Sequence, residues 1–283
     1  MFQKDKKINE DKVQCCICPH YCILSNYQIG KCLSRVNVEG IISPISYSHI
    51  SNMAVEPIEK KPFLHILKGT KTLSIGSWGC NLNCNFCEST CISQKKPNLI
   101  KIVNAYEIPD IVKKYSCQSV CLTYNEPIIS IEYLIDVINQ CNREGIKVLL
   151  KTNAYVNKDI WDYIINNVYA VNIDFKGDRD SFKEVTGAKE YVLEDRIKEA
   201  IFSTCHVEIS IPLYYKNISE MQASLEKLAF ILYEFKKDVP CHLLKINPAY
   251  KFIKRNTTSD EMINWAENLL NRCGSKYVQV FCS

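Results

Sequence analysis

The chain has 283 residues, of which 47% are apolar and 23% are charged, and its formal net charge at pH 7 is +4. This length and apolar content can form one sizeable core, or one core with a small appended module. Lysine and arginine are scattered among aspartate and glutamate, so the charge pattern does not indicate a nucleic-acid partner and we expect none.

Cysteine is the component that stands out, with 16 copies. The chain is too long and too rich in apolar residues to be a small secreted protein held together by disulfides. Its first residues are mostly charged, no apolar signal segment follows them, and no stretch is apolar enough to span a bilayer. We therefore expect a cytoplasmic protein without a membrane segment, in which clustered cysteines bind metal rather than pair with each other.

Residues 1–70 differ from the rest of the chain, because they hold five cysteines, several Gly and Pro residues and only short extended runs. Four of these cysteines form a candidate ligand set: Cys15, Cys18, Cys22 and Cys32. Cys16 could replace one of them, and His20 is close enough in the sequence to substitute. Four ligands with no open position suit either structural zinc or a second [4Fe–4S] cluster. We expect a small Cys-rich metal-binding module here, although a segment without metal is the alternative.

From residue 71 onward, short apolar runs alternate with helical patterns. Three segments carry apolar residues at the i, i+3, i+4, i+7 spacing of an amphipathic helix, at 131–138, 225–232 and 262–269. The second segment follows Ser219, which we expect to cap its helix. The runs predicted as strands lie at 72–75, 119–123, 147–152, 170–174, 206–211 and 242–246, and a last short run at 277–281 could add an edge strand.

Strands that alternate with helices favour parallel pairing through right-handed crossovers. Six such units fall short of the eight that close a full barrel. The predicted fold is therefore α/β: a partial (β/α)6 TIM-like barrel over residues 71–283, with the Cys-rich module of residues 1–70 in front of it.

Cys80, Cys84 and Cys87 follow the first of these strands directly. A parallel α/β domain presents its functional loops at this end of its strands. Three thiolates at this spacing can bind three irons of a cubane and leave the fourth iron open, whereas an electron-transfer cluster normally takes four cysteines. The alternatives are a zinc site whose fourth ligand comes from elsewhere, and three buried cysteines without metal. We favour the cluster with one open iron.

The pattern Cys-x-x-x-Cys-x-aromatic-Cys after the first strand of an α/β barrel resembles the radical S-adenosylmethionine (SAM) superfamily. The resemblance implies that SAM chelates the open iron through its amino and carboxylate groups. An electron from the reduced cluster would then cleave SAM to methionine and a 5′-deoxyadenosyl radical, which abstracts hydrogen. The cofactor carries such chemistry, while the protein positions it and excludes water. Phe86, the aromatic residue of the pattern, would pack against the cluster or the adenine.

The second strand ends in Tyr124-Asn125-Glu126-Pro127. These residues occupy the place of the family's Gly-Gly-Glu-Pro segment, which binds the SAM amine. Glu126 and Pro127 match that segment, whereas Tyr124 and Asn125 depart from its two glycines. The resemblance implies a SAM contact for Tyr124, Asn125 and Glu126.

The third and fourth strands end in segments similar to those of glycyl-radical-enzyme activases. Thr152 and Asn153 match a Thr-Asn-Gly segment, with Ala154 in place of the glycine, a change that matters only where the backbone needs a positive φ. Asp174 and Lys176 match an Asp-Leu-Lys segment, whose charged residues reach SAM or the substrate in those relatives. An ordinary surface ion pair is the alternative interpretation of Asp174 and Lys176.

Two further strands complete the predicted SAM site. Glu208 and Ser210 lie on the same face of the fifth strand, which could be the barrel interior. A buried Glu needs a partner, and the SAM ribose or amine is one candidate. Asn247, after the sixth strand, could contact the adenine.

The N-terminal segment sharpens the resemblance. Cys-x-x-Cys-Pro-His-x-Cys, followed by Arg35-Val36-Asn37 and by the Glu-Pro-Ile-Glu-Lys-Lys-Pro motif at 56–62, is similar to the AmmeMemoRadiSam-system radical SAM proteins. That group is usually described as similar to pyruvate formate-lyase activating enzyme. The match runs from about residue 13 to about residue 250. We find no chemical role for the motif at 56–62 from the sequence.

The function that the resemblance implies is radical chemistry on a protein or peptide substrate, as the activases perform. A partial barrel of about six strands would stay open on one side, which suits a bulky substrate. Radical chemistry on a small-molecule biosynthetic intermediate is the first alternative, and a non-catalytic iron–sulfur electron carrier or metal-binding regulator is the second. An activase-like enzyme would also need SAM and a one-electron donor such as flavodoxin or ferredoxin.

Overall fold

The computed structural model describes residues 2–235, 238–273, 275 and 277–281. Within this part of the chain, a sheet of eight strands runs through the molecule in the order β15-β14-β13-β12-β11-β10-β8-β7. All its strand pairs are parallel except β7 with β8 at one edge. The strands span β7 Asn52–Pro57, β8 Lys71–Gly76, β10 Ser119–Leu122, β11 Lys147–Thr152, β12 Ala170–Asp174, β13 His206–Pro212, β14 Cys241–Leu244 and β15 Val278–Phe281.

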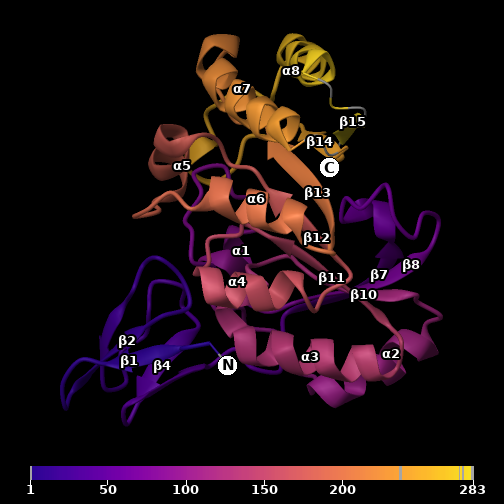
Figure 1. Cartoon of the computed structure of the whole chain (residues 1–283). Coiled ribbons are helices and arrows are strands. Elements are labelled where there is room, and N and C mark those ends of the chain that lie inside the picture. Colours follow the sequence, from indigo (N-terminus) through magenta and orange to yellow (C-terminus); the bar gives the residue numbers. More distant parts are fainter. Residues whose placement is uncertain (1, 236–237, 274, 276, 282–283) are drawn as a thin grey trace.

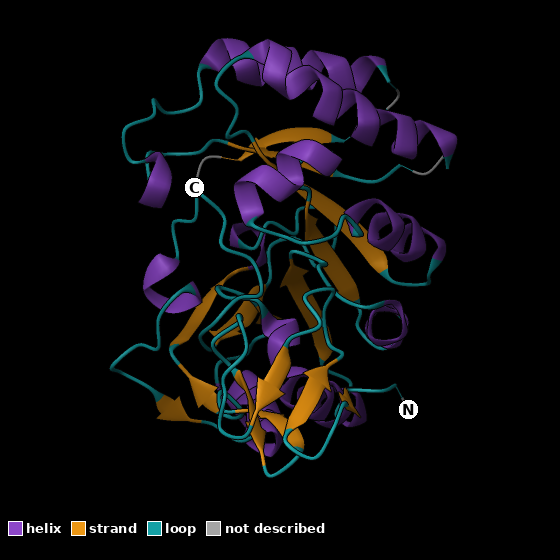
Figure 2. Cartoon of the chain, turned by 90° about the vertical axis from the view of Figure 1, so that its left-hand side faces the viewer, coloured by secondary structure: helices purple, strands orange, loops and turns teal. Residues whose placement is uncertain are grey.

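The helices connect successive parallel strands and lie along the outer side of the sheet (Figures 1 and 2). Strands β10 and β12 are buried nearly throughout, as expected for parallel strands covered on both sides. Among the described residues, every helix is either too short or too polar to cross a bilayer. The helices span α1 Thr90–Ser93, α2 Ile108–Lys114, α3 Ile131–Arg143, α4 Lys158–Ile165, α5 Arg179–Thr186, α6 Leu193–Phe202, α7 Ile218–Glu234 and α8 Asp260–Arg272, with 3-10 turns η1 Ile58–Lys60, η2 Ala105–Glu107, η3 Pro127–Ser130 and η4 Tyr250–Phe252.

This architecture confirms the predicted α/β partial barrel. All six predicted strands are present, and the predicted edge strand corresponds to β15, which pairs with β14. The sheet also includes β7, which lies inside the segment that the sequence analysis assigned to the N-terminal module. The predicted cap of α7 is wrong: Asn217, not Ser219, accepts a hydrogen bond from the backbone N–H of Glu220 at 2.9 Å.

The first fifty residues form a small β-rich unit beside the barrel, drawn in indigo at the lower left of Figure 1. Figure 2 views the molecule from the side on which this unit lies. Strands β1 and β3 flank β2 in an antiparallel sheet, β4 pairs with β5, and β6 pairs with β9. They span β1 Asp5–Lys7, β2 Lys12–Cys15, β3 Ile23–Ser25, β4 Arg35–Val38, β5 Ile41–Pro44, β6 His49–Ile50 and β9 Lys101–Ile102.

Candidate active site

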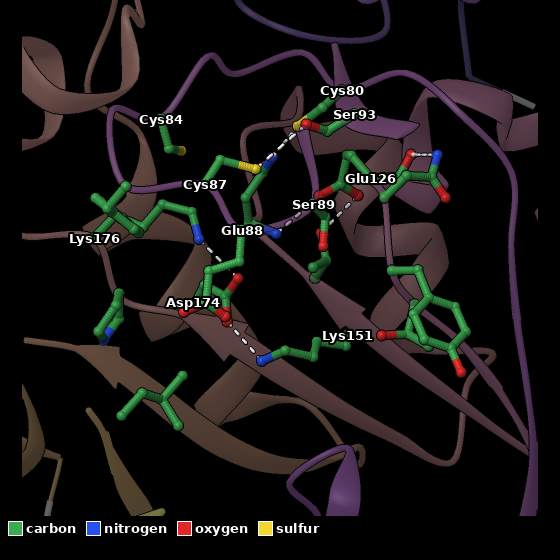
Figure 3. A pocket seen from close by; sticks show the side chains of 18 of the residues that line it. Cys80, Cys84, Cys87, Glu88, Ser89, Ser93, Glu126, Lys151, Asp174 and Lys176 are labelled. Carbon is green, nitrogen blue, oxygen red and sulfur yellow. Dashed lines mark hydrogen bonds and ion pairs between the residues drawn. The ribbon is translucent and has the colours of Figure 1, made fainter. Parts of the chain in front are cut away.

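A cavity of about 320 Å³ opens at the carboxyl ends of the parallel strands. Loops from β8, β10, β11 and β12 bring most of the predicted site residues to its wall (Figure 3). Such a position is where parallel α/β proteins bind ligands. The predicted residues that line it are Cys80, Cys84, Phe86, Cys87, Tyr124, Asn125, Glu126, Thr152, Asn153, Asp174 and Lys176.

The three cysteines of the loop after β8 share one wall of this cavity (Figure 3). The Sγ atom of Cys80 accepts hydrogen bonds from the backbone N–H of Leu82 at 3.4 Å and from Nδ2 of Asn153 at 3.6 Å. The Sγ atom of Cys87 lies 3.3 Å from Oγ of Ser93. Burial raises the pKa of Cys84 to about 12 and that of Cys80 well above its ordinary value. Metal binding at this loop must therefore displace thiol protons.

The spread of these thiols fits a cluster better than a single ion. Among the described residues, no three His, Cys, Asp or Glu side chains are arranged as ligands of one metal ion. An iron–sulfur cubane distributes its thiolate ligands over different irons. The donor set also fits the group chemically, because thiolates are its usual protein ligands.

Two glycines shape the loop that carries the cysteines. Gly79 has a φ of +88°, and a Cβ added there would lie 2.2 Å from the carbonyl oxygen of Cys32. A Cβ on Gly76 would lie 2.5 Å from the carbonyl oxygen of Thr123. Asn125 braces the same loop, because it accepts from the backbone N–H of Ser77 at 2.9 Å and donates to the carbonyl of Gly79 at 3.1 Å. The loop therefore needs glycine at both positions.

Glu126 places a buried carboxyl group at the cavity wall, with 2% of its surface exposed. One carboxylate oxygen accepts from Oγ1 of Thr152 at 2.9 Å, and the other accepts from the backbone N–H of Asn153 at 2.9 Å. Burial raises the pKa of Glu126 to about 7, although these hydrogen bonds oppose the shift. A cationic ligand in the cavity would stabilise the ionised form.

Asp174 lies between two lysines on the opposite side of the cavity (Figure 3). Its two carboxylate oxygens accept from Nζ of Lys151 and from Nζ of Lys176, each at 2.7 Å. Burial alone would raise the pKa of Asp174, but the two cations outweigh it and lower the pKa to about 2. The three side chains together carry one net positive charge. All three line the cavity.

Two residues that stand where the resemblance implies glycine adopt the left-handed backbone conformation. Tyr124 has a φ of +72° and Ala154 a φ of +52°. The Tyr124 hydroxyl donates to Glu56 at 2.9 Å, and the ammonium of Lys61 lies over the Tyr124 ring at 4.2 Å. Lys61 also pairs with Glu56 at 2.5 Å. Ion pairing and ring contacts thus hold Tyr124 in a backbone conformation that non-glycine residues rarely adopt.

Phe86 stacks face to face with Tyr214, with ring centroids 4.6 Å apart and planes 7° apart. Tyr214 stacks in turn on Tyr215 at 4.3 Å. Phe86 is buried and lines the cavity beside the cysteines. It therefore packs the loop against the barrel while leaving part of its surface available to a ligand.

The prediction that Glu208 contacts SAM is wrong. Glu208 lies toward the amino end of β13, where the backbone N–H groups of Leu64 and His65 donate to its carboxylate at 3.0 and 3.1 Å. His206 and His242 donate to it at 2.9 and 2.5 Å. These four donors satisfy the buried carboxylate. They do so toward the amino ends of the strands, whereas the cavity lies at the carboxyl ends, where barrel enzymes place their active sites.

Ser210 and Asn247 also lie outside the cavity wall. Ser210 lies beneath it, donating to Oδ1 of Asn172 at 2.6 Å and accepting from Lys151 at 3.2 Å, so it supports a lysine that faces the cavity. Asn247 lines a different cavity, of about 340 Å³, beside Tyr215 and Arg255. The two cavities share Ile246, the neighbour of Asn247, so an adenine contact of Asn247 stays a prediction.

Several cavity residues were missed by the sequence analysis. Lys151 directly precedes Thr152 on β11 and lines the cavity. The parallel register pairs it with Asn172 of β12, two residues before Asp174. Lys60 and Lys61, from the motif that had no assigned role, line the cavity as well. A lysine next to a predicted ligand at a strand end was the available signal for Lys151, whereas no local signal pointed to Lys60.

Comparisons with known proteins bear on the identity of this site. Residues 75–226 match the sequence model of the radical SAM superfamily. The protein MJ0808 of Methanocaldococcus jannaschii is 31% identical over 280 residues, which cover 97% of this chain and 83% of MJ0808. A 4-hydroxyphenylacetate decarboxylase activating enzyme of Clostridioides difficile (strain 630) is 27% identical over 124 residues, which cover 40% of this chain and only 39% of that enzyme.

The fold is similar to that of Streptococcus suis SuiB bound to S-adenosylmethionine, with a TM-score of 0.56 and 14% identity over 72% of this chain and 48% of SuiB. At this identity the likeness concerns the fold alone. Family membership follows from the sequence matches, which span the cysteine loop and the strands that face it. This chain belongs to the radical SAM superfamily of enzymes, which use a [4Fe–4S] cluster and SAM.

Proposed function

We propose that Cys80, Cys84 and Cys87 hold the [4Fe–4S] cluster of this enzyme, with SAM in the adjoining cavity, and that a protein or peptide is the substrate. The observation that carries the proposal is the arrangement of three thiols and one buried carboxyl group, that of Glu126, around a single cavity. When bound, the cluster and SAM supply a reductive cleavage that gives methionine and a 5′-deoxyadenosyl radical, which takes hydrogen from the substrate.

The side chains of the cavity divide into groups with different tasks. Glu126 offers a carboxylate to the N–H groups of the SAM amine, and Thr152 and Asn153 hold that carboxylate in place by hydrogen bonds. Asp174 orients Lys151 and Lys176, whose excess positive charge suits a carboxylate or another anionic group. Tyr124 and Phe86 supply ring surface that excludes water.

Two observations support a protein or peptide substrate. The cavity is open to the surface, and the sheet ends at β7 and β15 without closing, so a bulky chain can approach the carboxyl ends of the strands. One of the relatives is named as an activating enzyme of a decarboxylase, and SuiB has been solved with the precursor peptide SuiA. A one-electron donor such as flavodoxin or ferredoxin would reduce the cluster.

SAM cleavage is the first test of this proposal. The reconstituted protein is reduced with dithionite and supplied with SAM, and 5′-deoxyadenosine is measured by chromatography. We expect Cys80→Ala to abolish the product and Cys117→Ala, at a thiol outside the cavity, to leave it unchanged. Cleavage by Cys80→Ala at the wild-type rate would show that the cluster assignment is wrong.

A second test addresses the size of the substrate. Extract of the source cells is separated by ultrafiltration, and each fraction is added to the reduced enzyme with SAM. We expect the macromolecular fraction to stimulate 5′-deoxyadenosine formation, and protease treatment of that fraction to remove the effect. Stimulation confined to the small-molecule fraction would instead support a biosynthetic intermediate as substrate.

A further inference from the structure

We propose that Cys15, Cys18, Cys22 and Cys32 hold a second iron–sulfur cluster, closed by four thiolates, where the N-terminal unit meets the loop of Cys80. This assignment concerns a site outside the SAM cavity and does not rest on the proposed function. It also selects one ligand set and one class of metal centre from those that the sequence leaves open.

The four thiols line one small enclosed cavity. Cys15, Cys18 and Cys32 are buried, with 7%, 9% and 8% of their surface exposed. The backbone N–H of Cys15 donates to the carbonyl of Cys22 at 2.8 Å, which holds these two cysteines side by side. The chain thus brings all four to one place, from the end of β2, the segment between β2 and β3, and the turn before β4.

The structure excludes Cys16 from this set. Its side chain is directed to a separate surface pocket beside Tyr21 and Asn157, and its Sγ atom lies 3.7 Å from the carbonyl of Gln14. Adjacent residues of an extended segment point to opposite sides, so Cys15 and Cys16 cannot both face the cavity. Cys15 is therefore the ligand of that pair.

His20 has a different task from the cysteines. Its Nε2 donates to the carbonyl of Asn81 at 2.7 Å, and its ring packs edge-on against Tyr155 at 5.1 Å. Its Nδ1 is buried and has no hydrogen-bond partner in the described part of the chain, so it is the one competing donor. The four thiols already complete a ligand set without it.

Backbone N–H groups lie beside three of these sulfurs. They belong to residues 17, 20 and 34, each two residues further along the chain than Cys15, Cys18 and Cys32, and they favour the thiolate form. The loop of the proposed SAM cluster has the same arrangement, because the N–H of Leu82 donates to Cys80. Hydrogen bonds to the sulfurs are among the features that tune iron–sulfur clusters.

The cavity size favours a cluster over zinc. The cavity admits about one water-sized sphere, whose centre can move over a volume of about 10 Å³. A tetrahedral zinc site would draw all four sulfurs to about 2.3 Å from the ion and leave no such space. No three of these side chains are arranged around one ion among the described residues. A thiol-lined space offers water too few polar partners to fill it, whereas a cubane occupies it and binds every sulfur.

A buried cation balances the charge that such a centre would bring. Arg35 lines the same cavity with 1% of its surface exposed. Its guanidinium pairs with Glu132 of α3 through two contacts of 2.9 Å. Lys4 also pairs with Glu132 at 3.2 Å, so the three side chains together carry one net positive charge. Four thiolates around a cluster give a net anion, which this charge partly offsets.

The second site is joined to the SAM site by direct contacts. The carbonyl of Cys32 lies against Gly79, which precedes Cys80. His20 bonds to the carbonyl of Asn81, whose side chain accepts from Asn153 at 2.9 Å, and Asn153 also donates to the sulfur of Cys80. Filling the N-terminal site therefore fixes the loop that carries the first cluster.

Metal content tests this assignment directly. Iron, acid-labile sulfide and zinc are measured on anaerobically reconstituted protein, and we expect about eight irons per wild-type chain and no zinc, as two [4Fe–4S] clusters require. Cys18→Ala/Cys22→Ala should retain about four irons, and so should Cys80→Ala/Cys84→Ala/Cys87→Ala, by the same count. Cys16→Ala and His20→Ala serve as controls and should retain the wild-type content.

The variants separate this proposal from the proposed function. About four irons in the wild type with one zinc, or iron unchanged by Cys18→Ala/Cys22→Ala, would overturn the second cluster. Iron loss in His20→Ala without loss in Cys22→Ala would overturn the ligand set. If Cys18→Ala/Cys22→Ala fails to fold, Cys80→Ala/Cys84→Ala/Cys87→Ala still tests the proposal. Without the first site, the chain must retain a cluster whose spectrum does not change when SAM is added. Loss of all iron in the folded triple variant contradicts the proposal.

Discussion

At the scale of the single residue, Glu126 combines deep burial with an ionisable group that has room for a cationic partner. Its raised pKa of about 7 means that the SAM-free protein holds much of this carboxyl group protonated at neutral pH. In the proposed function the amino group of SAM donates a hydrogen bond to the ionised form. SAM affinity should therefore rise as the pH increases through about 7.

The variant Glu126→Gln should weaken SAM binding by at least about tenfold, because a hydrogen bond to a charged group contributes about 1.5–3 kcal/mol. It should also remove the pH dependence. Calorimetric titration of oxidised, reconstituted protein measures both effects without SAM cleavage. Glu144→Gln, at an exposed carboxylate outside the cavity, is the matched control. Equal affinities of wild type and Glu126→Gln at pH 8 would rule out this role.

The residue scale also shows what sequence reasoning can reach. Glu126, Asn153 and Asp174 were predictable because each lies at or shortly after the end of a strand, and parallel strands end at one edge of the sheet. Glu208 was misplaced because alternation identifies the face of a strand but not the depth along it. Glu208 and Ser210 are two positions apart, which is about 6–7 Å along the strand, so the two side chains lie in different layers of the barrel.

Backbone conformation was harder to anticipate than position. Ala154 stands where the resemblance implies glycine, and its φ of +52° is the left-handed conformation that glycine adopts readily. A left-handed alanine costs about 1–2 kcal/mol. The burial of Ala154 and the bond from its N–H to Oγ1 of Thr152 hold it there. A non-glycine residue gives no local sign of such a requirement.

At the scale of the element, the two predictions for the start of α7 can be compared in one experiment. Asn217→Ala removes the side chain that accepts from the N–H of Glu220, and we expect a loss of about 1 kcal/mol in the free energy of unfolding. Ser219→Ala should change it little, because Ser219 already lies inside the helix. Urea denaturation of both variants measures the difference. A larger loss for Ser219→Ala would favour the sequence-based cap.

Glu208 joins β13, β14 and the segment after η1 into one buried network. Burial would raise its pKa, but the bonds from His206 and His242 outweigh burial and lower the pKa to about 2. Because the pKa of Glu208 is lower in the folded protein, its carboxylate stabilises the fold at pH values above its ordinary pKa of 4.5. This stabilisation is lost as the pH falls toward about 2. The network therefore contributes at neutral pH and weakens in acid.

We expect Glu208→Gln to lower the free energy of unfolding by about 3 kcal/mol at pH 7, at about 1.4 kcal/mol per unit of pKa shift. The difference in the free energy of unfolding between the wild type and Glu208→Gln should narrow as the pH falls below 4.5. Urea denaturation across this pH range measures it, with Glu144→Gln on the exposed surface as control. A gap that stays constant with pH would show that the loss comes from packing rather than from the carboxylate.

Strands were the most predictable elements because parallel strands buried on both faces read as short apolar runs. β11 and β12 match their predicted bounds. β7 escaped because its residues, Asn52–Pro57, are half-exposed or exposed along its length, and an edge strand carries little apolar signal. Its pairing with β8 is a long-range choice that local pattern does not reveal.

At the scale of the whole molecule, the N-terminal unit is docked on the barrel by a few specific contacts. Arg35 is the most buried of them, and besides Glu132 it donates to the carbonyls of Ile129 and Ile42 at 3.1 Å. It thereby ties β4 to α3 and η3. The sequence marked the unit by its cysteines but could not show this docking, because Arg35 and Glu132 are 97 residues apart.

Arg35→Met should loosen the docked unit more than it disturbs the barrel. Removing one partner of a buried ion pair costs about 3–5 kcal/mol, and here it leaves two carbonyls without their donor and Glu132 with Lys4 as its remaining partner. We expect limited proteolysis to cut the first fifty residues sooner than in the wild type, while the remaining fragment resists. Lys113→Met, at an exposed ion pair, is the matched control and should digest like the wild type. Local opening can release one part of a protein while the rest stays folded. Uniform digestion of the whole Arg35→Met chain would therefore show that unit and barrel unfold together and would contradict this prediction.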